Sequence, residues 1–246
     1  MKKLQQKIFN LGMACILIFI CVLFYREPAT QPVFTEKKYV GLTYDDGPSQ
    51  LTTQALIDLL NKYDASATFF INGNHANENK ELVKSIYEQG NEIGNHTLDH
   101  IWLTKASQEE RERQIYGNES LLKFLSGQQG DMLVRPPYGD INKDILEEFD
   151  VPFIMWSVDS RDWEIRNAAS IQDNVFMHIE DGDIIIMHDG YTSTIEATEE
   201  ILKRMQREGF EVVSVSELFE LKNKERSNFS EVSVFNETSV LKDYFE

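Results

Sequence analysis

Cysteine is nearly absent from this chain of 246 residues, and both copies, Cys15 and Cys21, lie in one apolar segment at its N-terminus. The rest of the chain therefore has no thiol with which to form a disulfide. This excludes the small disulfide-stapled scaffolds of secreted proteins, which use such bonds in place of a large core. Stability must come instead from a hydrophobic core or a bound metal ion.

Basic residues are also scarce, at 24 lysines and arginines against 41 aspartates and glutamates. The first 26 residues hold four of these bases and no acid, which leaves the remainder with 20 bases and a formal charge of −21. A surface of that sign repels nucleic acid and anionic lipid headgroups. We therefore expect no nucleic-acid partner.

A long apolar run occurs once, from Ile8 to Tyr25, and three lysines precede it. This pattern is typical of a signal peptide or a single membrane anchor. The 18 residues of the run lie between the 10 to 14 of a signal and the about 20 of a membrane span. Because no small-x-small cleavage site follows, we favour an uncleaved anchor over residues 1–26, with the rest outside the cell membrane. The alternative is a cleaved signal and a secreted protein.

The remainder of the chain reads as a linker at residues 27–37, one domain at 38–220 and a tail at 221–246. Within the domain, apolar runs of strand length alternate with apolar residues at helical spacing, which indicates an α/β fold. About seven parallel strands should close into a barrel, with a flat doubly wound sheet as the alternative. Strands are predicted at 38–43, 67–71, 91–94, 132–135, 153–158, 183–188 and 210–215, with helices at 51–63, 80–89, from 107 onward, and at 143–149, 168–178 and 194–206.

Two adjacent carboxylates, Asp45 and Asp46, follow the first predicted strand, which Gly47 and Pro48 must end. Like charges side by side repel each other unless a cation or a basic side chain neutralises them. The pair therefore predicts a metal or acid–base site, against the alternative of a solvated turn. In a parallel α/β barrel the carboxyl ends of the strands share one rim. Other reactive residues follow later strands, so we expect them on the same rim.

His96 and His100 are four residues apart, so on a helical turn both imidazoles would project from one face. An isolated pair of this spacing is a weak signal. With Asp46 as a third ligand, it becomes a site of two histidines and one carboxylate with open positions for water and substrate. Zinc suits these ligands best, although cobalt, nickel or iron would fit the same geometry.

Arg135 begins the stretch Arg-Pro-Pro-Tyr-Gly. One interpretation is a proline-rich turn with a surface arginine. In the other, Arg135 pairs with Asp45 and orients it, while the backbone N–H of Tyr138 stabilises a developing oxyanion.

His188 ends an apolar strand and is either a core histidine or a general acid. We favour the acid because Asp162 is available to hold its imidazole and raise its pKa. Trp163, beside Asp162, is expected to line a sugar-binding groove. For His75 and His178 we predict no functional role.

These motifs together resemble the polysaccharide deacetylase family, which is the NodB-homology domain of carbohydrate esterase family 4. The resemblance covers roughly residues 38–220. It rests on Thr43-Tyr-Asp-Asp-Gly-Pro48, His96-Thr-x-x-His100, Arg135-x-Pro-Tyr138, Asp159-x-x-Asp162-Trp163 and Ile186-x-His188.

The resemblance implies a distorted (β/α) barrel, a divalent metal, and removal of acetyl groups from amino sugars or acetylated polysaccharides. It implies Asp45 as the catalytic base and His188 as the acid, with Arg135 and Asp162 as their partners. Ile186 stands where the family usually has leucine, in a substrate pocket for the acetyl methyl group. Asp46, His96 and His100 would hold the metal.

Because the domain is expected outside the membrane, we predict N-acetylglucosamine in peptidoglycan as its substrate. Chitin oligomers, poly-N-acetylglucosamine and O-acetylated xylan remain alternatives. A noncatalytic glycan-binding protein is a rival of another class. A metallophosphoesterase is weaker, because such sites often need two metal ions.

Overall fold

The computed structural model describes residues 37–228, together with side chains as far as residue 224. The predicted anchor at 1–26, nearly all of the predicted linker, and the end of the predicted tail lie outside these residues. Among the helices described, none combines the length and the apolar character that a membrane crossing requires.

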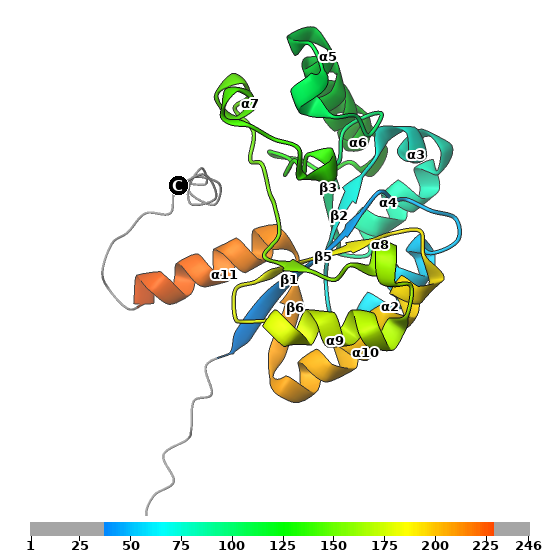
Figure 1. The fold of residues 1–246 in the computed structure, drawn as a ribbon, viewed down its shortest axis with the longest axis vertical. Coiled ribbons are helices and arrows are strands. Elements are labelled where there is room, and N and C mark those ends of the chain that lie inside the picture. The colour runs from blue at the N-terminus through cyan, green and yellow to red at the C-terminus, as the bar shows by residue number, and fades with distance from the viewer. Residues whose placement is uncertain (1–36, 229–246) are drawn as a thin grey trace, which may run out of the picture. The chain divides into compact units, whose positions relative to one another are not determined.

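Six parallel strands form one sheet in the described part of the chain (Figure 1). The order is β3-β2-β1-β5-β4, and β6 pairs with the N-terminal half of β1. The central strand β1 thus contacts three others, which places its carboxyl end in the middle of the sheet. The strands are β1 (Lys38–Asp45), β2 (Thr68–Ile71), β3 (Glu92–Asn95), β4 (Val158–Asp159), β5 (Ile184–His188) and β6 (Phe210–Val213).

Helices separate the strands, as the alternating pattern predicted, and Figure 1 shows α9 and α10 side by side. Capping agrees with the sequence as well, because the Ser107 side chain accepts a hydrogen bond from the backbone N–H of Glu110 at 3.3 Å. The α-helices are α2 (Thr53–Lys62), α3 (Gly73–Glu78), α4 (Lys80–Glu88), α5 (Gln108–Glu112), α6 (Asn118–Ser126), α7 (Lys143–Glu148), α8 (Asp162–Ile165), α9 (Ala168–His178), α10 (Thr192–Glu208) and α11 (Val215–Asn228). Short helical turns are η1 (Leu103–Lys105), η2 (Arg113–Gly117) and η3 (Pro137–Gly139).

Two of the predicted strands, 132–135 and 153–158, were wrong in extent. Val134 makes only single bridges, to Asn95 and to Phe153, and regular strand resumes only at β4. Prolines explain the interruption, because Pro136 follows this segment directly and Pro152 precedes Phe153. Proline has no N–H to give to a ladder and fixes φ, so pairing stops beside it. The described chain therefore has six strands where about seven were predicted.

These bridges nevertheless extend the sheet from its edge strand β3 toward its other edge strand, β4. They extend it beyond β3 to Val134 and then to Phe153, and β4 begins only five residues later, at Val158. Five residues span at most about 18 Å. The chain itself thus links the two edges of the sheet, which gives a barrel whose wall is interrupted rather than a flat doubly wound sheet.

Side chains alternate across the wall of this barrel. In β1, Val40, Leu42 and Tyr44 pack outward into the main core beneath the helices, whereas Tyr39 belongs to a second cluster. That second cluster draws on β1, β2, β5, β6 and both bridge segments, so it fills the inside of the barrel. Since alternate residues share a face, Thr43 and Asp45 point to the same side as Tyr39.

A helix that was not predicted, α11, begins at Val215, which the sequence pattern had placed at the end of a strand. Val215 and Leu218 of this helix are buried in the cluster inside the barrel. Both also lie against Gly41 of β1, where an added Cβ would come within 3.3 Å of Leu218. The helix thereby covers the end of the barrel at which β1 begins. It crosses residue 220, so the predicted domain boundary there stays a prediction.

Candidate active site

Asp45 and Asp46 diverge at the end of β1. Asp45 is the last strand residue, is 2% exposed, and lies directly beside His188 in the register of β1 and β5. Asp46 follows at φ +73°, a left-handed conformation that turns the chain out of the strand. His75 of α3 fixes this turn, since its Nδ1 lies 2.6 Å from the backbone oxygen of Asp46. No role had been predicted for His75.

His96 and His100 do come together, but not on a helical turn as predicted. Residues 96–100 form a bend after β3, and both Thr97 and His100 have positive φ, at 65° and 54°. The ring centroids of the two histidines are 4.9 Å apart. Buried Gln114 supports the bend, because its backbone and side-chain oxygens accept the N–H groups of residues 98 and 99.

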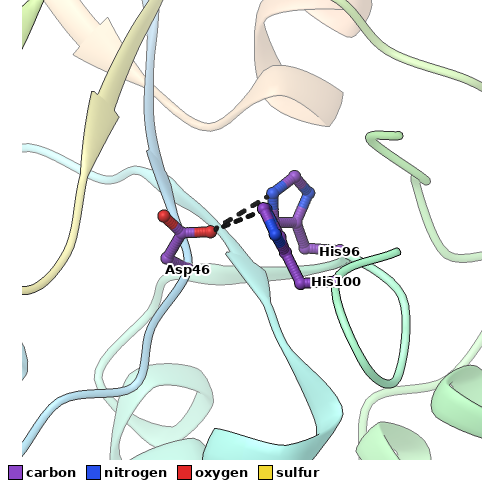
Figure 2. Close-up of side chains that lie close together, drawn as sticks. All are labelled: Asp46, His96 and His100. Atoms are coloured by element: carbon purple, nitrogen blue, oxygen red, sulfur yellow. Dashed lines mark ion pairs between the residues drawn. The ribbon is translucent and has the colours of Figure 1, made fainter. Parts of the chain in front are cut away.

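Three side chains converge on one point, as Figure 2 shows. The Oδ1 atom of Asp46 lies 3.4 Å from Nε2 of His96 and 3.2 Å from Nε2 of His100. One ligand atom from each residue lies within 4.8 Å of the others. The backbone oxygen of Arg135 lies 2.8 Å from Nδ1 of His96, so in the neutral ring that nitrogen carries the proton and Nε2 keeps the lone pair that a metal ion needs. Two imidazoles and a carboxylate therefore fit a divalent metal ion.

In the absence of a cation, the electrostatics of this cluster favour a charged carboxylate. Burial raises the pKa of Asp46, but hydrogen bonds from His100 and His96 outweigh it and hold the pKa well below its usual range. For His96, burial lowers the pKa, and the charges of Asp45 and Asp46 outweigh that effect and raise it. Without a metal ion, the negative charge of the site thus favours protonation of the His96 imidazole, as expected of a site that suits a cation.

Arg135 is fully buried and joins Asp45 from inside the barrel. Its Nη1 donates to Oδ1 of Asp45 at 2.8 Å and to the Thr43 hydroxyl at 2.6 Å. Its Nε and Nη2 donate to the backbone oxygens of residues 154 and 155, and the guanidinium lies 4.0 Å from the ring centre of Phe70. This network fixes Oδ1 of Asp45, whereas Oδ2 lies 3.8 Å from Nε2 of His96. The carboxylate therefore faces the cluster with its second oxygen.

His188 and Asp162 form a second buried pair beside Asp45. Oδ1 of Asp162 lies 2.7 Å from Nδ1 of His188, and Oδ2 accepts the backbone N–H of His188 and the hydroxyl of Thr194. With the N–H of Trp163, four donors surround this carboxylate. Burial lowers the pKa of His188, but the bond to Asp162 and the charge of Asp45 outweigh it and raise the pKa to about 9. Nδ1 is thus occupied, and Nε2 is the nitrogen left for chemistry.

The remaining predicted residues lie around these pairs. Tyr138 has φ +62° and, among residues 37–228, no acceptor pairs with its backbone N–H. Its hydroxyl lies 3.1 Å from Nδ1 of His100. Ile186 is 4% exposed, two residues before His188 on the inner face of β5. Trp163 is half exposed, directly after Asp162. All ten residues predicted for the site thus lie in segments at the carboxyl ends of the strands.

Comparison with known proteins agrees with this geometry. The sequence model described as polysaccharide deacetylase matches residues 33–151. A peptidoglycan-N-acetylglucosamine deacetylase of Bacillus cereus is 35% identical over 202 residues, which cover 79% of this chain and 94% of that protein. The chain belongs to the polysaccharide deacetylase family. The resemblance seen in the sequence is therefore confirmed, and so is the α/β fold with a parallel sheet.

The peptidoglycan-N-acetylmuramic acid deacetylase PdaC of Bacillus subtilis is 36% identical over 197 residues. The match covers 80% of this chain but only 42% of PdaC, so this chain spans about two fifths of that relative's length. The solved structure of PdaC superimposes with a TM-score of 0.75 and covers 78% of this chain and 95% of the solved one. The shared part is thus the deacetylase fold itself.

One residue near the site of this family member was missed in the sequence. Asp189 is buried next to His188, and its carboxylate accepts hydrogen bonds from the hydroxyls of Thr52 and Thr53. Its backbone N–H donates to the backbone carbonyl oxygen of Asp45 at 2.8 Å. A Cβ at Gly47 would lie 2.4 Å from this carboxylate, so the turn after the paired aspartates needs glycine there. An acid directly after a strand-end histidine was the signal available.

Replacing Asp162 with asparagine should lower the pKa of His188 by about 1 to 3 pH units in the metal-free protein. Asparagine keeps the size of the side chain but loses the charge, and its NH₂ group would face donors where an acceptor is needed. The imidazole pKa can be followed by NMR titration after chelation. Asp159→Asn, which removes an exposed carboxylate that accepts from the backbone of Arg161, is the control.

The same pair predicts a pH dependence of stability. Folding raises the pKa of His188 above its ordinary 6.5, to about 9. Its contribution to the free energy of unfolding is therefore fully present below pH 6.5 and is lost as pH rises through about 9. In Asp162→Asn this loss should shrink. An unchanged His188 titration in that variant would contradict the pairing.

Proposed function

We propose that residues 38–220 form a metal-dependent domain that removes N-acetyl groups from N-acetylglucosamine units of an extracytoplasmic polysaccharide, most directly peptidoglycan. One observation carries the proposal. The Asp46–His96–His100 cluster faces a carboxylate held by Arg135, and that carboxylate lies beside an imidazole held by Asp162. The family membership and the names of the relatives, which are peptidoglycan deacetylases, support it.

Asp46, His96 and His100 would hold the metal, and zinc suits their ligand types best, with cobalt, nickel or iron as alternatives. When bound there, the ion supplies Lewis-acid polarisation of the acetamide carbonyl and a lower pKa for water. Charge and donor type fit, because the carboxylate stays ionised and the Nδ1 nitrogen of His96 is already occupied by the backbone.

Asp45 acts in this proposal as the general base. Its Oδ1 is fixed by Arg135, so Oδ2, on the side of His96, is the oxygen that accepts a proton from the attacking water. The water oxygen bonds to the carbonyl carbon, and the former carbonyl oxygen becomes an oxyanion. The backbone N–H of Tyr138 then donates a hydrogen bond to that oxygen.

His188 acts as the general acid. An amine leaves poorly unless it is protonated, and the imidazolium delivers its proton from Nε2 because Nδ1 is held by Asp162. The carbon–nitrogen bond then breaks, which leaves acetate and a free amino sugar. Ile186 and Trp163 are proposed to contact the acetyl group and the sugar.

The location of the enzyme is part of the proposal. Residues 1–26 would anchor the domain at the outer face of the cell membrane, or would be cleaved to release it. The relatives act on both glucosamine-type and muramic-acid-type units, as their names state. The choice of sugar unit is therefore open between them. Chitin oligomers, poly-N-acetylglucosamine and O-acetylated xylan are the alternative polymers.

The test is acetate release by the purified full chain, with each polymer as substrate. We expect acetate from peptidoglycan, its loss on chelation, and its return when zinc is added back. If acetate were released from acetyl-xylan and from no other polymer, the substrate would be an O-acetyl ester and not the proposed N-acetyl amide. Exposed Trp102 and Trp163 also suit a noncatalytic glycan-binding protein. That rival predicts polymer binding that survives chelation, with no acetate from any substrate.

A further inference from the structure

A column of aromatic rings extends outward from the metal-type cluster. Tyr138 meets the ring of His100 edge-on, with centroids 4.6 Å apart. Trp102 stacks on Tyr138 at 4.1 Å and 10°, and the ammonium of Lys105 lies 4.2 Å from the centre of the Trp102 ring. Tyr138 and Trp102 are 54% and 43% exposed, so their apolar surfaces are available at the rim.

The loops that carry this column are locked together. Leu103, between Trp102 and Lys105 in η1, is fully buried and anchors one loop. The backbone N–H of Thr104 donates to the Asp140 carboxylate at 2.9 Å, and the Thr104 hydroxyl donates to both of its oxygens. Asp140 directly follows the turn that holds Tyr138. The stack is therefore preorganised, and such preorganisation lowers the entropic cost of binding.

Lys105 is the unusual member of the column. The chain carries a formal charge of −17, and most described lysines and arginines pair with a carboxylate. Among the residues that the structure describes, no carboxylate pairs with Lys105. Its ammonium lies over the indole ring of Trp102 instead. An exposed contact between a cation and an aromatic ring is only weakly stabilising. The side chain can therefore swing away when a ligand offers a better partner.

We propose that this column binds the sugar next to the unit being deacetylated, and that Lys105 recognises a carboxylate on that sugar. As the ammonium leaves the indole to pair with the carboxylate, it uncovers the ring face on which the sugar packs. The substrate class is thus a carboxylated amino-sugar polymer, of which a glycan with alternating muramic acid is the example. This inference rests on the proposed function and narrows its substrate.

Two tetrasaccharides of equal length test the inference. One is uncharged chitotetraose, and the other alternates N-acetylglucosamine with N-acetylmuramic acid whose lactyl carboxylates are free. Lys105→Gln should lower kcat/KM for the muramic-acid substrate by about 5-fold, the upper range of an exposed ion pair. It should leave chitotetraose within about 2-fold. Esterifying the carboxylates should abolish the difference between wild type and variant.

Trp102→Ala should lower kcat/KM for both substrates by about 10-fold, since the aromatic contact does not depend on charge. Lys203→Gln on α10 is the control for net charge, because Lys203 pairs with Glu199 and Glu200 on that helix. Lys203→Gln should leave kcat/KM unchanged for both substrates.

Equal effects of Lys105→Gln on both substrates, or none on either, would overturn the inference. If the wild type releases no acetate, the proposed function fails instead. Calorimetric binding of the two tetrasaccharides then still decides the role of Lys105. The wild type must bind the muramic-acid compound more tightly than Lys105→Gln does, and chitotetraose equally.

Discussion

Alanine in place of Asp46 is expected to remove the bound metal and with it the deacetylase activity. Asp46 is the only carboxylate of the three residues that converge, and its Oδ1 lies within 3.4 Å of both imidazole nitrogens. Losing an outer hydrogen-bond partner of a metal ligand already costs about 10- to 100-fold in affinity or activity. Losing a ligand should cost more, so we expect turnover to fall by at least about 1000-fold.

Metal content by elemental analysis after dialysis, together with acetate release, measures this effect. Asp58→Ala is a matched control, because Asp58 is an exposed aspartate on α2 whose carboxylate, among the side chains that the structure describes, accepts only from Gln54. The control should keep both metal and turnover. Full metal occupancy in Asp46→Ala would show that another set of ligands holds the ion, and the proposed centre would have to be abandoned.

Alanine in place of His188 should reduce kcat by about 100- to 10,000-fold, the usual contribution of a positioned general acid. KM should change little, because the imidazole is needed for proton transfer and not for binding the glycan. His178→Ala removes an exposed histidine at the end of α9 and serves as the control.

A second readout separates proton donation from a merely structural role. An aryl acetate ester has a leaving group that departs without protonation, so His188→Ala should lose far less activity on it than on an N-acetyl substrate. A uniform loss on both substrates would indicate a damaged site. Undiminished turnover of the N-acetyl substrate would exclude His188 as the acid.

The sequence predicted that the candidate site residues lie together because a parallel α/β fold gathers the carboxyl ends of its strands on one side. Asp46, His96 and His100 were grouped on this basis, and the structure brings their ligand atoms within 4.8 Å of one another. The reason given for the two histidines was wrong, since they lie on a bend with positive φ at Thr97 and His100. Spacing alone could not distinguish that bend from a helical turn.

Local patterns also failed where neighbouring prolines decided the outcome. The apolar stretches at 132–135 and 153–158 have the composition of strands, yet they pair through single bridges. Helix α11 was missed for the opposite reason. Most of its residues are polar, so the few apolar ones that pack against the barrel, Val215 and Leu218, form no clear helical pattern in the sequence. Such contacts with distant segments leave no periodic signal in the sequence.

By itself, the sequence determined the family and the alternation of strands and helices, and it named the candidate site residues, because all of these are carried by local pattern and motif. Only the tertiary structure decided which oxygen of Asp45 is free, how four donors enclose Asp162, and that Trp102 stacks between Tyr138 and Lys105. These arrangements depend on segments far apart in the chain. Their distances and angles are set by packing rather than by neighbours in sequence.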